Sequence, residues 1–372
     1  MKETEIEIVI IGGGLAGLIS AILLARAGKA VILVEKKTYP FHRVCGEYIS
    51  NEVMGFLRRE DLFPEFLDLP QISRFEFSDT FGKNTQISLD LGGFGISRYV
   101  LDQWLFEKAT QEGVIFCTGT QVTEIDFHVQ EEKFDLLLSD TSRIRADFVV
   151  GAFGKRSKLD KVLNRPFIKK RSPYIGVKYH VKTAYVRDTV ALHNFEGGYC
   201  GLNAIEDGKF NLCYLGSREQ LRAFGSVEEM ERQVLWKNPI LERIFKGSEF
   251  LFEKPEVINE INFEPKSPVE NHLLMAGDSA GLITPLCGNG MAIAIHSGKL
   301  AAEALLTGKN RSEIENIYAT NWNAEFRRRL WVGRNVQRLF GARGASVFAG
   351  TLIRHIPFFA NQIIKNTHGR PF

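Results

Sequence analysis

Two glycine-rich segments, far apart in the sequence, carry the residues whose types and spacing indicate chemistry. The first has Gly12, Gly14 and Gly17 in the pattern Gly-x-Gly-x-x-Gly. Glycines at this spacing allow a tight turn, close approach of the backbone to a pyrophosphate, and close packing of a helix on a strand. Glu35 follows about 20 residues later, a reach suited to accepting hydrogen bonds from a ribose. This segment therefore predicts a dinucleotide site.

The second segment runs from Gly277 through Asp278 to Gly290. An aspartate on a glycine-rich turn can accept hydrogen bonds from a polyol such as a ribityl chain. The stretch Pro285–Gly290 lets the backbone approach a ring closely, and a helix is expected to begin near Met291. A helix N-terminus aimed at a flavin favours negative charge on the reduced ring. The second segment thus predicts FAD rather than NAD as the bound nucleotide.

The elements that must position these residues form a βαβ unit. The apolar runs Ile6–Ile11 and Ala30–Val34 predict buried parallel strands, and Leu15–Ala27 between them predicts a helix. The strands Asp147–Val150 and Leu273–Ala276 are expected to return to the same sheet. We therefore expect an α/β fold whose Rossmann-like FAD-binding domain is discontinuous in sequence.

A second, strand-rich domain is expected to be inserted into the first. Residues Phe75–Leu91 alternate apolar and polar types, and Pro173 to about Glu264 contains mostly short strands with one helical stretch at Val227–Trp236. This pattern predicts a mainly antiparallel substrate domain. The predicted division is 1–72, 95–160 and 268–308 for the FAD-binding domain, 73–94 and 161–267 for the substrate domain, and 309–372 for a helical C-terminal region.

The composition excludes several classes of protein. The chain has 372 residues and a formal charge of +3, too small to favour a nucleic-acid partner. Its five cysteines lack Cys-x-x-Cys spacing, which argues against a disulfide framework or a zinc site and fits a reducing cytoplasm. No apolar run is long enough to predict a spanning helix, and we expect no metal.

Together these motifs resemble the FAD-dependent oxidoreductases that include the aromatic hydroxylases of the para-hydroxybenzoate hydroxylase type and the geranylgeranyl reductases. The resemblance covers most of residues 5–305 and includes Arg43–Glu47, Arg98 in Arg-x-x-Leu-Asp, and Gly151–Ser157. Cys45-Gly46-Glu47 is similar to the reductase branch in particular.

The resemblance implies roles for individual residues. Arg98 would contact the FAD, Asp278 would hold the ribityl chain, and the backbone near Val122 would meet the adenine. NAD(P)H is the electron donor that it implies, but Phe153 stands where the family usually has the aspartate associated with handling it. The expected cofactor-binding residues are Gly12, Gly14, Leu15, Ala16, Gly17, Glu35, Lys36, Arg43, Cys45, Arg98, Val122, Asp278, Gly288, Gly290 and Met291.

Substrate contacts are expected on the inserted sheet and in the stretch Pro285–Gly290. With period-two alternation, Tyr199 and Asn203 share one face, where a phenol and an amide can orient a polar group. The alternative for Tyr199 is half-buried packing. Pro285 and Cys287 are further candidates, although Cys287 also suits a tight turn simply as a small residue. No histidine arrangement identifies a general base, so the catalytic residues are left unassigned.

The C-terminal region is rich in arginine. Arginines including Arg327, Arg328, Arg329 and Arg334 are interleaved with Leu330, Trp331 and Val332, and the pattern extends beyond Arg343. One interpretation is an amphipathic basic helix that makes peripheral contact with an anionic membrane. The other is a helical cap packed over the protein with its arginines in solvent.

Three functions fit the sequence. The first is a monooxygenase that hydroxylates a hydrophobic small molecule, either aromatic or lipid-like. The second is a flavoprotein that reduces C=C bonds of an isoprenoid or similar chain. The third is a flavin-holding partner protein without catalysis, for which Phe153 in place of aspartate is the supporting feature.

Overall fold

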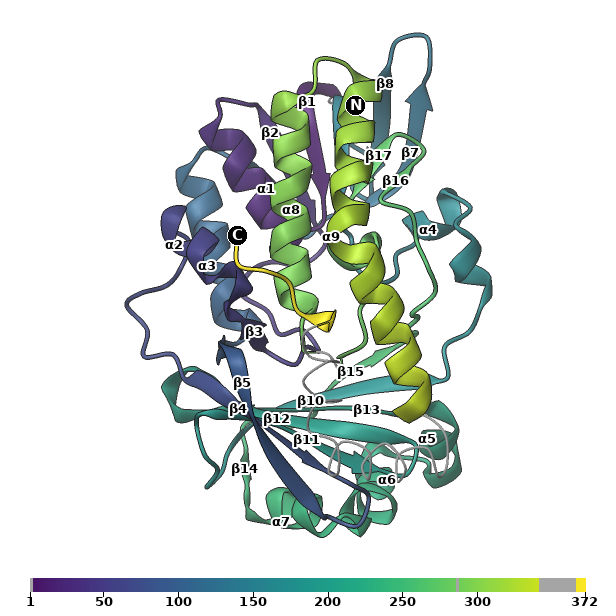
Figure 1. Ribbon diagram of the computed structural model, residues 1–372. Helices are drawn as coiled ribbons and strands as arrows, with labels where there is room; N and C mark the ends of the chain where they lie inside the picture. The colour runs from purple at the N-terminus through teal and green to yellow at the C-terminus, as the bar shows by residue number, and fades with distance from the viewer. Residues whose placement is uncertain (1–2, 286–287, 341–365) are drawn as a thin grey trace.

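The computed structural model describes residues 3–285, 288–340 and 366–372, and two β-sheets organise them (Figure 1). The first sheet and its helices occupy the upper part of the view, and the second sheet spans the lower part. The helices are α1 Leu15–Arg26, α2 Met54–Arg59, α3 Arg98–Gln111, α4 Leu159–Val162, α5 Arg218–Phe224, α6 Val227–Gln233, α7 Pro239–Gly247, α8 Gly290–Thr307 and α9 Arg311–Phe340.

The first sheet has the strand order β16-β17-β9-β1-β2-β6. Strand β1 lies between β2 and β9 and is parallel to both, as the βαβ pattern predicts. Strands β7 and β8 form an antiparallel pair, and β8 also pairs with β9. The bounds are β1 Glu3–Ile11, β2 Val31–Glu35, β6 Ile115–Thr118, β7 Val122–His128, β8 Lys133–Leu138, β9 Arg143–Gly151, β16 Val269–Glu270 and β17 Leu273–Met275.

The second sheet has the order β14-β10-β13-β12-β11-β4-β5-β3, with β15 pairing to β10. All of its pairings are antiparallel except that of β4 with β11. The bounds are β3 Tyr48–Ser50, β4 Gln71–Ser78, β5 Asn84–Gly95, β10 Tyr174–Lys182, β11 Thr189–Phe195, β12 Gly198–Ala204, β13 Phe210–Ser217, β14 Glu249–Phe250 and β15 Glu256–Asn259. The α/β fold class with an added, mainly antiparallel sheet is thus confirmed.

The exact domain limits remain a proposal. Strand β3 falls inside the range 1–72, which we assigned to the FAD-binding domain, and yet it pairs with β5 in the second sheet. The segment around β3 therefore crosses from one layer to the other, and residues on both sides of it are brought to the junction of the two sheets.

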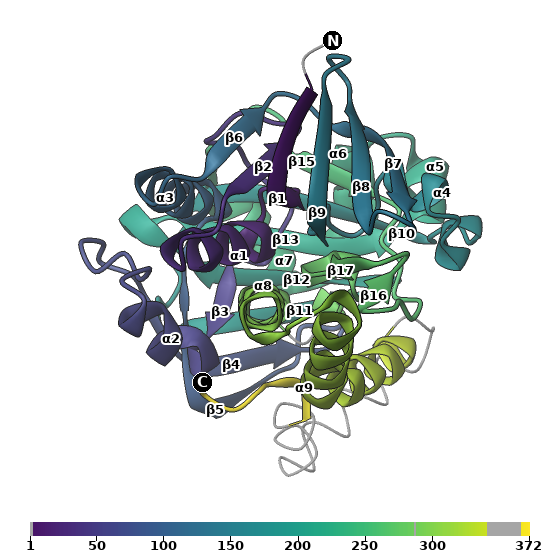
Figure 2. The same ribbon diagram turned by 90° about the horizontal axis from the view of Figure 1, so that it is seen from above.

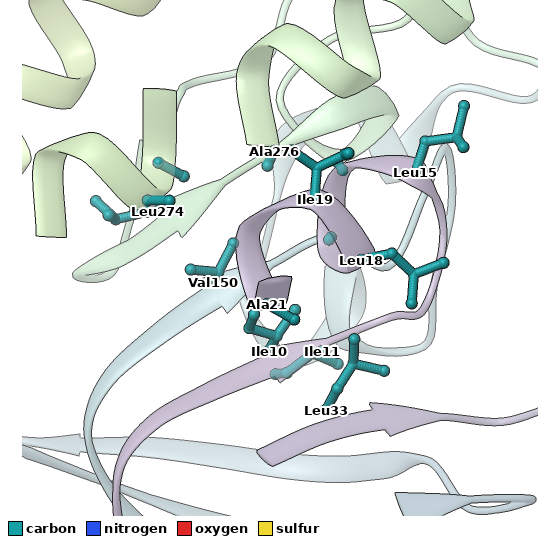
Figure 3. Close-up of a cluster of buried hydrophobic side chains, with 14 of the residues drawn as sticks. Ile10, Ile11, Leu15, Leu18, Ile19, Ala21, Leu33, Val150, Leu274 and Ala276 are labelled. Carbon is teal, nitrogen blue, oxygen red and sulfur yellow. The ribbon is translucent and has the colours of Figure 1, made fainter. Parts of the chain in front are cut away.

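The core of the upper part explains why α1 is apolar around most of its surface. Leu18 and Ile19 are fully buried between the first sheet and the neighbouring helices (Figure 3). Figure 2 shows α1 and α8 side by side. A side chain at Gly298 of α8 would collide with the backbone of Ala16, and Ser20 Oγ donates to Gly298 O at 2.8 Å. Small residues thus let the two helices meet closely and hold the loops at their N-termini together.

One face of helix α9 packs against the rest of the protein, and the other face is exposed to solvent. Tyr318, Trp322, Phe326 and Leu330 are buried, whereas Trp331 is 60% exposed. Arg327 and Arg328 are exposed, but Arg329 is buried. No helix in the described ranges is long and apolar enough to cross a membrane. The predicted basic pattern from Arg343 to residue 365 lies outside the described residues.

Candidate functional site

The first glycine loop joins β1 to α1 at the junction of sheet and helices. Gly12 has a φ of +106°, and a side chain there would strike the backbone of Ala152. A side chain at Gly17 would strike Gly12 itself. At Gly14, by contrast, the nearest atom to an added Cβ is Arg98 Nη2 at 3.6 Å. Two glycines therefore permit the turn, and the third leaves open space at the N-terminus of α1.

Glu35 lies at the end of β2, beside this loop. Its carboxylate accepts from Gly13 N at 2.8 Å, Lys37 N at 3.1 Å and Arg43 Nη2 at 3.2 Å. A carboxylate has about four acceptor sites, so capacity for a ribose hydroxyl remains. The neighbouring Lys36 is exposed, while Val122 is buried at the start of β7. These positions suit the predicted adenosine end of the site, which remains a proposal.

Two arginines converge on one buried aspartate near the N-terminus of α1. Arg98 binds Asp102 through Nε at 2.7 Å and Nη2 at 2.8 Å, and Arg43 Nε binds it at 3.0 Å. Asp102 is fully buried, so both guanidinium groups are held in fixed positions. Two oriented cations beside a helix N-terminus favour the binding of a pyrophosphate.

The flavin end of the site is assembled from three loops. Gly277 and Gly288 have φ values of +62° and +63°, which let the backbone turn before and after Asp278. Gly290 and Met291 begin α8, as the sequence predicts. Added Cβ atoms at Gly46 and Gly154 would meet nothing within 4 Å. With Gly14 these glycines outline an open cradle, so the residues present fit an extended dinucleotide. Leu15 and Ala16 are buried in the first turn of α1.

Asp278 lies in an unusual electrostatic setting. Burial raises the pKa of its carboxyl group, while Lys266 and Lys155 act in the opposite direction. Lys266 Nζ donates to the carbonyl oxygens of Lys155 and Asp278, at 2.8 Å each. Gly154 N donates to Ser279 Oγ at 2.9 Å. The loop after β9 is thereby fastened to the turn that carries Asp278.

A cavity of about 230 Å³ lies between these loops and the second sheet. Cys45, Gly46, Asp278, Pro285 and Gly288 line the side that faces the nucleotide domain. The opposite wall comes from the second sheet and is mostly apolar: Phe75, Phe77, Leu89, Leu192, Tyr199, Gly201, Asn203 and Leu215. The structure thus places Tyr199 and Asn203 on the cavity wall, as period-two alternation predicts. Cys287 lies outside the described residues.

A buried ionic cluster that the sequence analysis did not identify is centred on Glu47, at the end of the segment Arg43–Glu47. Glu47, with a φ of +52°, directs its carboxylate to the Lys178 ammonium and to His180 Nε2 at 2.7 Å. Its Oε1 also accepts from Arg98 N at 2.7 Å. Glu47 and Lys178 are both fully buried. The available signal was the pair of polar residues, Lys178 and His180, spaced by two on the apolar strand β10.

Asn211, on strand β13 of the second sheet, binds the backbone of the same segment, Arg43–Glu47. Its Nδ2 donates to Cys45 O at 3.2 Å and to Gly46 O at 2.8 Å. With the Glu47 cluster, this fixes the backbone of Cys45 and Gly46 against the substrate sheet. The segment Arg43–Glu47 therefore acts as a clamp between the two layers.

Lys155 is a cavity residue that sequence reasoning also missed. It follows Gly154, whose φ is +83°, and it is the one lysine or arginine among the described residues that line the cavity. Burial lowers its pKa to about 8, against an opposing effect of Asp278. No spacing rule identifies a lysine in this loop, although Lys155 lies two residues after Phe153, where the chain departs from the resemblance.

The C-terminal peptide, residues 366–372, contributes the last part of the wall. Thr367 and His368 line the cavity. The peptide is anchored on buried Glu52, which accepts from Gly369 N at 2.5 Å and from Arg329 Nη2 at 2.8 Å. Asn289, which directly precedes α8, donates to Glu52 at 3.0 Å. Arg329, one of the arginines of the predicted basic helix, is therefore buried in an ion pair with Glu52 and does not form part of a solvent-facing surface.

Comparisons with known proteins identify the family of this chain. The profile of the family described as "FAD binding domain" matches residues 5–247. "Menaquinone reductase" of Mycobacterium tuberculosis H37Rv is 23% identical over 321 residues, covering 82% of this chain and 77% of that protein. Among solved structures, pqsL of Pseudomonas aeruginosa, described as a probable FAD-dependent monooxygenase, has a TM-score of 0.75 at 17% identity and covers 92% and 99% of the two chains.

A second solved structure represents the reductase side of the resemblance. It is a geranylgeranyl bacteriochlorophyll reductase-like protein of Thermoplasma acidophilum, with a TM-score of 0.73 and 17% identity, covering 98% of this chain and all of that one, 100%. Identities this low establish the fold alone. The family match spans more than half of the sequence and includes the glycine loop, Glu35 and both arginines. This chain therefore belongs to the FAD-binding-domain family and is an FAD-dependent oxidoreductase.

Proposed function

We propose that the protein is a monooxygenase that hydroxylates a hydrophobic small molecule, aromatic or lipid-like. The observation that carries this proposal is the largely apolar cavity between the flavin-side loops and the second sheet. FAD, when bound, supplies the oxygen chemistry. The residues of this chain would bind and orient the substrate, exclude water and fix the ring through the clamp Arg43–Glu47.

The proposed reaction consumes one O₂ and one two-electron donor. One oxygen atom enters a C–H bond of the substrate, and the other leaves as water with the two electrons and two protons. Reaction under ¹⁸O₂, followed by mass spectrometry of the product, tests this directly. A product that carries one ¹⁸O atom supports hydroxylation, whereas a product labelled only from H₂¹⁸O would rule it out.

A second candidate function is reduction of C=C bonds in an isoprenoid or similar chain. Cys45-Gly46-Glu47 and the similarity to a protein named menaquinone reductase favour it. Against it stands the sequence from Tyr199 to Ala204, where Gly201 replaces the large aromatic residue expected from the prenyl reductases. Turnover of a polyprenyl substrate under nitrogen, with gain of two hydrogens and no oxygen requirement, would favour this function over the first.

The electron donor is proposed to be NAD(P)H. This proposal needs its own test, because Phe153 replaces the aspartate that the resemblance associates with handling NAD(P)H. Phe153 packs against the core, at the position where the resemblance to the flavin-dependent family implies an aspartate. Stopped-flow bleaching of the flavin by NADH and by NADPH measures the donor. If neither reduces the flavin, photoreduction can supply the electrons, so the hydroxylation test does not depend on this point.

We also propose that the C-terminal region makes peripheral contact with anionic membranes. Exposed Arg327 and Arg328 support this on α9. Deleting the chain from Arg343 onward would also remove the peptide docked on Glu52, so charge reversal is the cleaner perturbation. Arg327→Glu is expected to reduce sedimentation with phosphatidylserine vesicles, while phosphatidylcholine vesicles serve as the control. Unchanged sedimentation would contradict the proposed contact.

A further inference from the structure

The C-terminal peptide runs from α9 past the N-terminus of α8 to α2 (Figure 1). At its start, Arg328 Nη2 donates to Asn366 Oδ1 at 3.0 Å. At its end, Phe372 N donates to Glu52 O at 3.2 Å, and the Phe372 ring stacks on His296 with the ring centroids 3.8 Å apart. Chain ends are ordinarily poorly ordered unless contacts tie them down. Contacts at both ends therefore hold this peptide in one place.

Further contacts hold the backbone on both sides of His368. Before it, Thr367 O accepts from Asn289 Nδ2 at 3.1 Å. After it, Gly369 N donates to Glu52 Oε2 at 2.5 Å. Asn289 donates to the same carboxylate oxygen at 3.0 Å. Because Glu52 and Asn289 are buried, and Asn289 directly precedes α8, the position of His368 is set relative to the flavin end of the site.

One part of the peptide faces the cavity and another part faces solvent. Thr367 and His368 line the cavity, and Thr367 is only 1% exposed. Arg370 and Pro371, just beyond them, are exposed. The peptide therefore lies between the cavity and the surrounding water and forms part of the outer wall of the cavity.

We infer that the C-terminal peptide belongs to the substrate site: Thr367 and His368 contact the substrate, and the docked peptide keeps water out of the cavity. This inference rests on the proposed function in taking the cavity as the place where a hydrophobic substrate binds, and it holds for either candidate reaction. Shielding contributes to affinity in both, because an apolar ligand gains free energy from each part of its surface that is removed from water. Glu52 is then a positioning residue, which acts on the substrate only through the peptide.

Two substitutions are expected to undock the peptide through different contacts. A Cβ atom at Gly369 would lie 2.7 Å from Arg329 Nη1 and 2.9 Å from Glu52 Oε1. Gly369→Val therefore cannot keep the hydrogen bond to Glu52 in its present geometry. Phe372→Ala instead removes the ring that stacks on His296. Phe372 is not among the described residues that line the cavity, so this second variant leaves the wall itself unaltered.

Two measurements on the oxidised holoprotein examine the site without turnover. The change in flavin absorbance gives the Kd of butylbenzene, and acrylamide quenching of flavin fluorescence gives the access of solvent to the ring. Both undocking variants should bind butylbenzene about fivefold more weakly, the effect of returning roughly 40 Å² of apolar surface to water, and their quenching should rise toward that of free FAD. His368→Ala should also weaken binding, while the peptide stays resistant to carboxypeptidase. Arg370→Gln, which changes an exposed residue of the same peptide, should match the wild type.

Circular dichroism and FAD content of each variant separate folding from binding, and carboxypeptidase digestion reports release of the peptide. If the released variants bind butylbenzene as tightly as the wild type, the peptide only packs, and the inference is wrong while the proposed function stands. If they lose affinity for FAD but the remaining holoprotein binds butylbenzene normally, the peptide serves the cofactor and the inference is again wrong. If butylbenzene does not perturb the flavin of the wild type, both the inference and the proposed function are refuted.

Discussion

Replacing Lys178 by methionine tests whether the buried ionic cluster holds the two sheets together. Methionine keeps most of the length and the apolar stem of lysine but removes the ammonium group. Glu47 would then retain His180 Nε2 at 2.7 Å and Arg98 N at 2.7 Å, but would lose its buried cation. Both side chains are completely buried, so solvent cannot replace the lost partner.

The expected cost follows from that burial. Removing one partner of a buried ion pair typically destabilises a protein by about 3–5 kcal/mol, because the other charge stays desolvated. We therefore expect Lys178→Met to lower the free energy of unfolding by about 3–5 kcal/mol. The double variant Lys178→Met/Glu47→Gln should recover part of this loss, since it removes the unpaired charge. Lys182→Met is the matched control: its ammonium lies 3.9 Å from Glu249 with 58% of the side chain exposed, and should cost less than about 1 kcal/mol.

Urea denaturation followed by circular dichroism measures these differences, and its pH dependence adds a second check. Burial acts to raise the pKa of Glu47, but Lys178 and His180 outweigh it and hold the pKa below 4.5. This stabilisation is complete above the unfolded-state pKa and is lost as the pH falls through the folded-state pKa. The gap between wild type and Lys178→Met should therefore narrow below about pH 4. Equal stabilities of Lys178→Met and Lys182→Met near neutral pH would refute the reasoning.

Two further predictions concern the cofactor and the C-terminal peptide. Glu35→Gln should weaken FAD binding about tenfold by removing a charged acceptor for the ribose, measured by fluorescence titration of the apoprotein; unchanged affinity would contradict the assignment. Glu52→Ala leaves the Arg329 guanidinium buried without its carboxylate, so the peptide 366–372 should become sensitive to carboxypeptidase, whereas the wild type resists.

Local patterns made the nucleotide half of the fold predictable. Strand β1, helix α1, strand β2 and the acid at its end lie close together in sequence, and each has a distinct signal in glycine spacing or apolar periodicity. Period-two alternation also sufficed to place Tyr199 and Asn203 on one face of β12. In these cases the chemistry depends on residues whose separation is set by the geometry of one or two elements.

Residues joined across the two sheets could not be predicted in the same way. Glu47 meets Lys178 and His180 because the segment before β3 crosses between layers, and no local pattern encodes that pairing. Lys155 is a cavity residue only because its loop is tied to the turn at Ser279. Arg329 was expected to lie on a basic surface. It is instead buried in an ion pair with Glu52, which is distant in sequence. Long-range contacts decide the role of each of these side chains.

The most direct test of the proposed function is the fate of oxygen in a single turnover. Holoprotein reduced anaerobically, then mixed with meta-pentylphenol, a hydrophobic aromatic probe, and ¹⁸O₂, should yield a hydroxylated product containing one ¹⁸O atom. Recovery of the phenol unchanged, together with two-electron reduction of a polyprenyl compound under nitrogen, would contradict the monooxygenase assignment and favour the reductase.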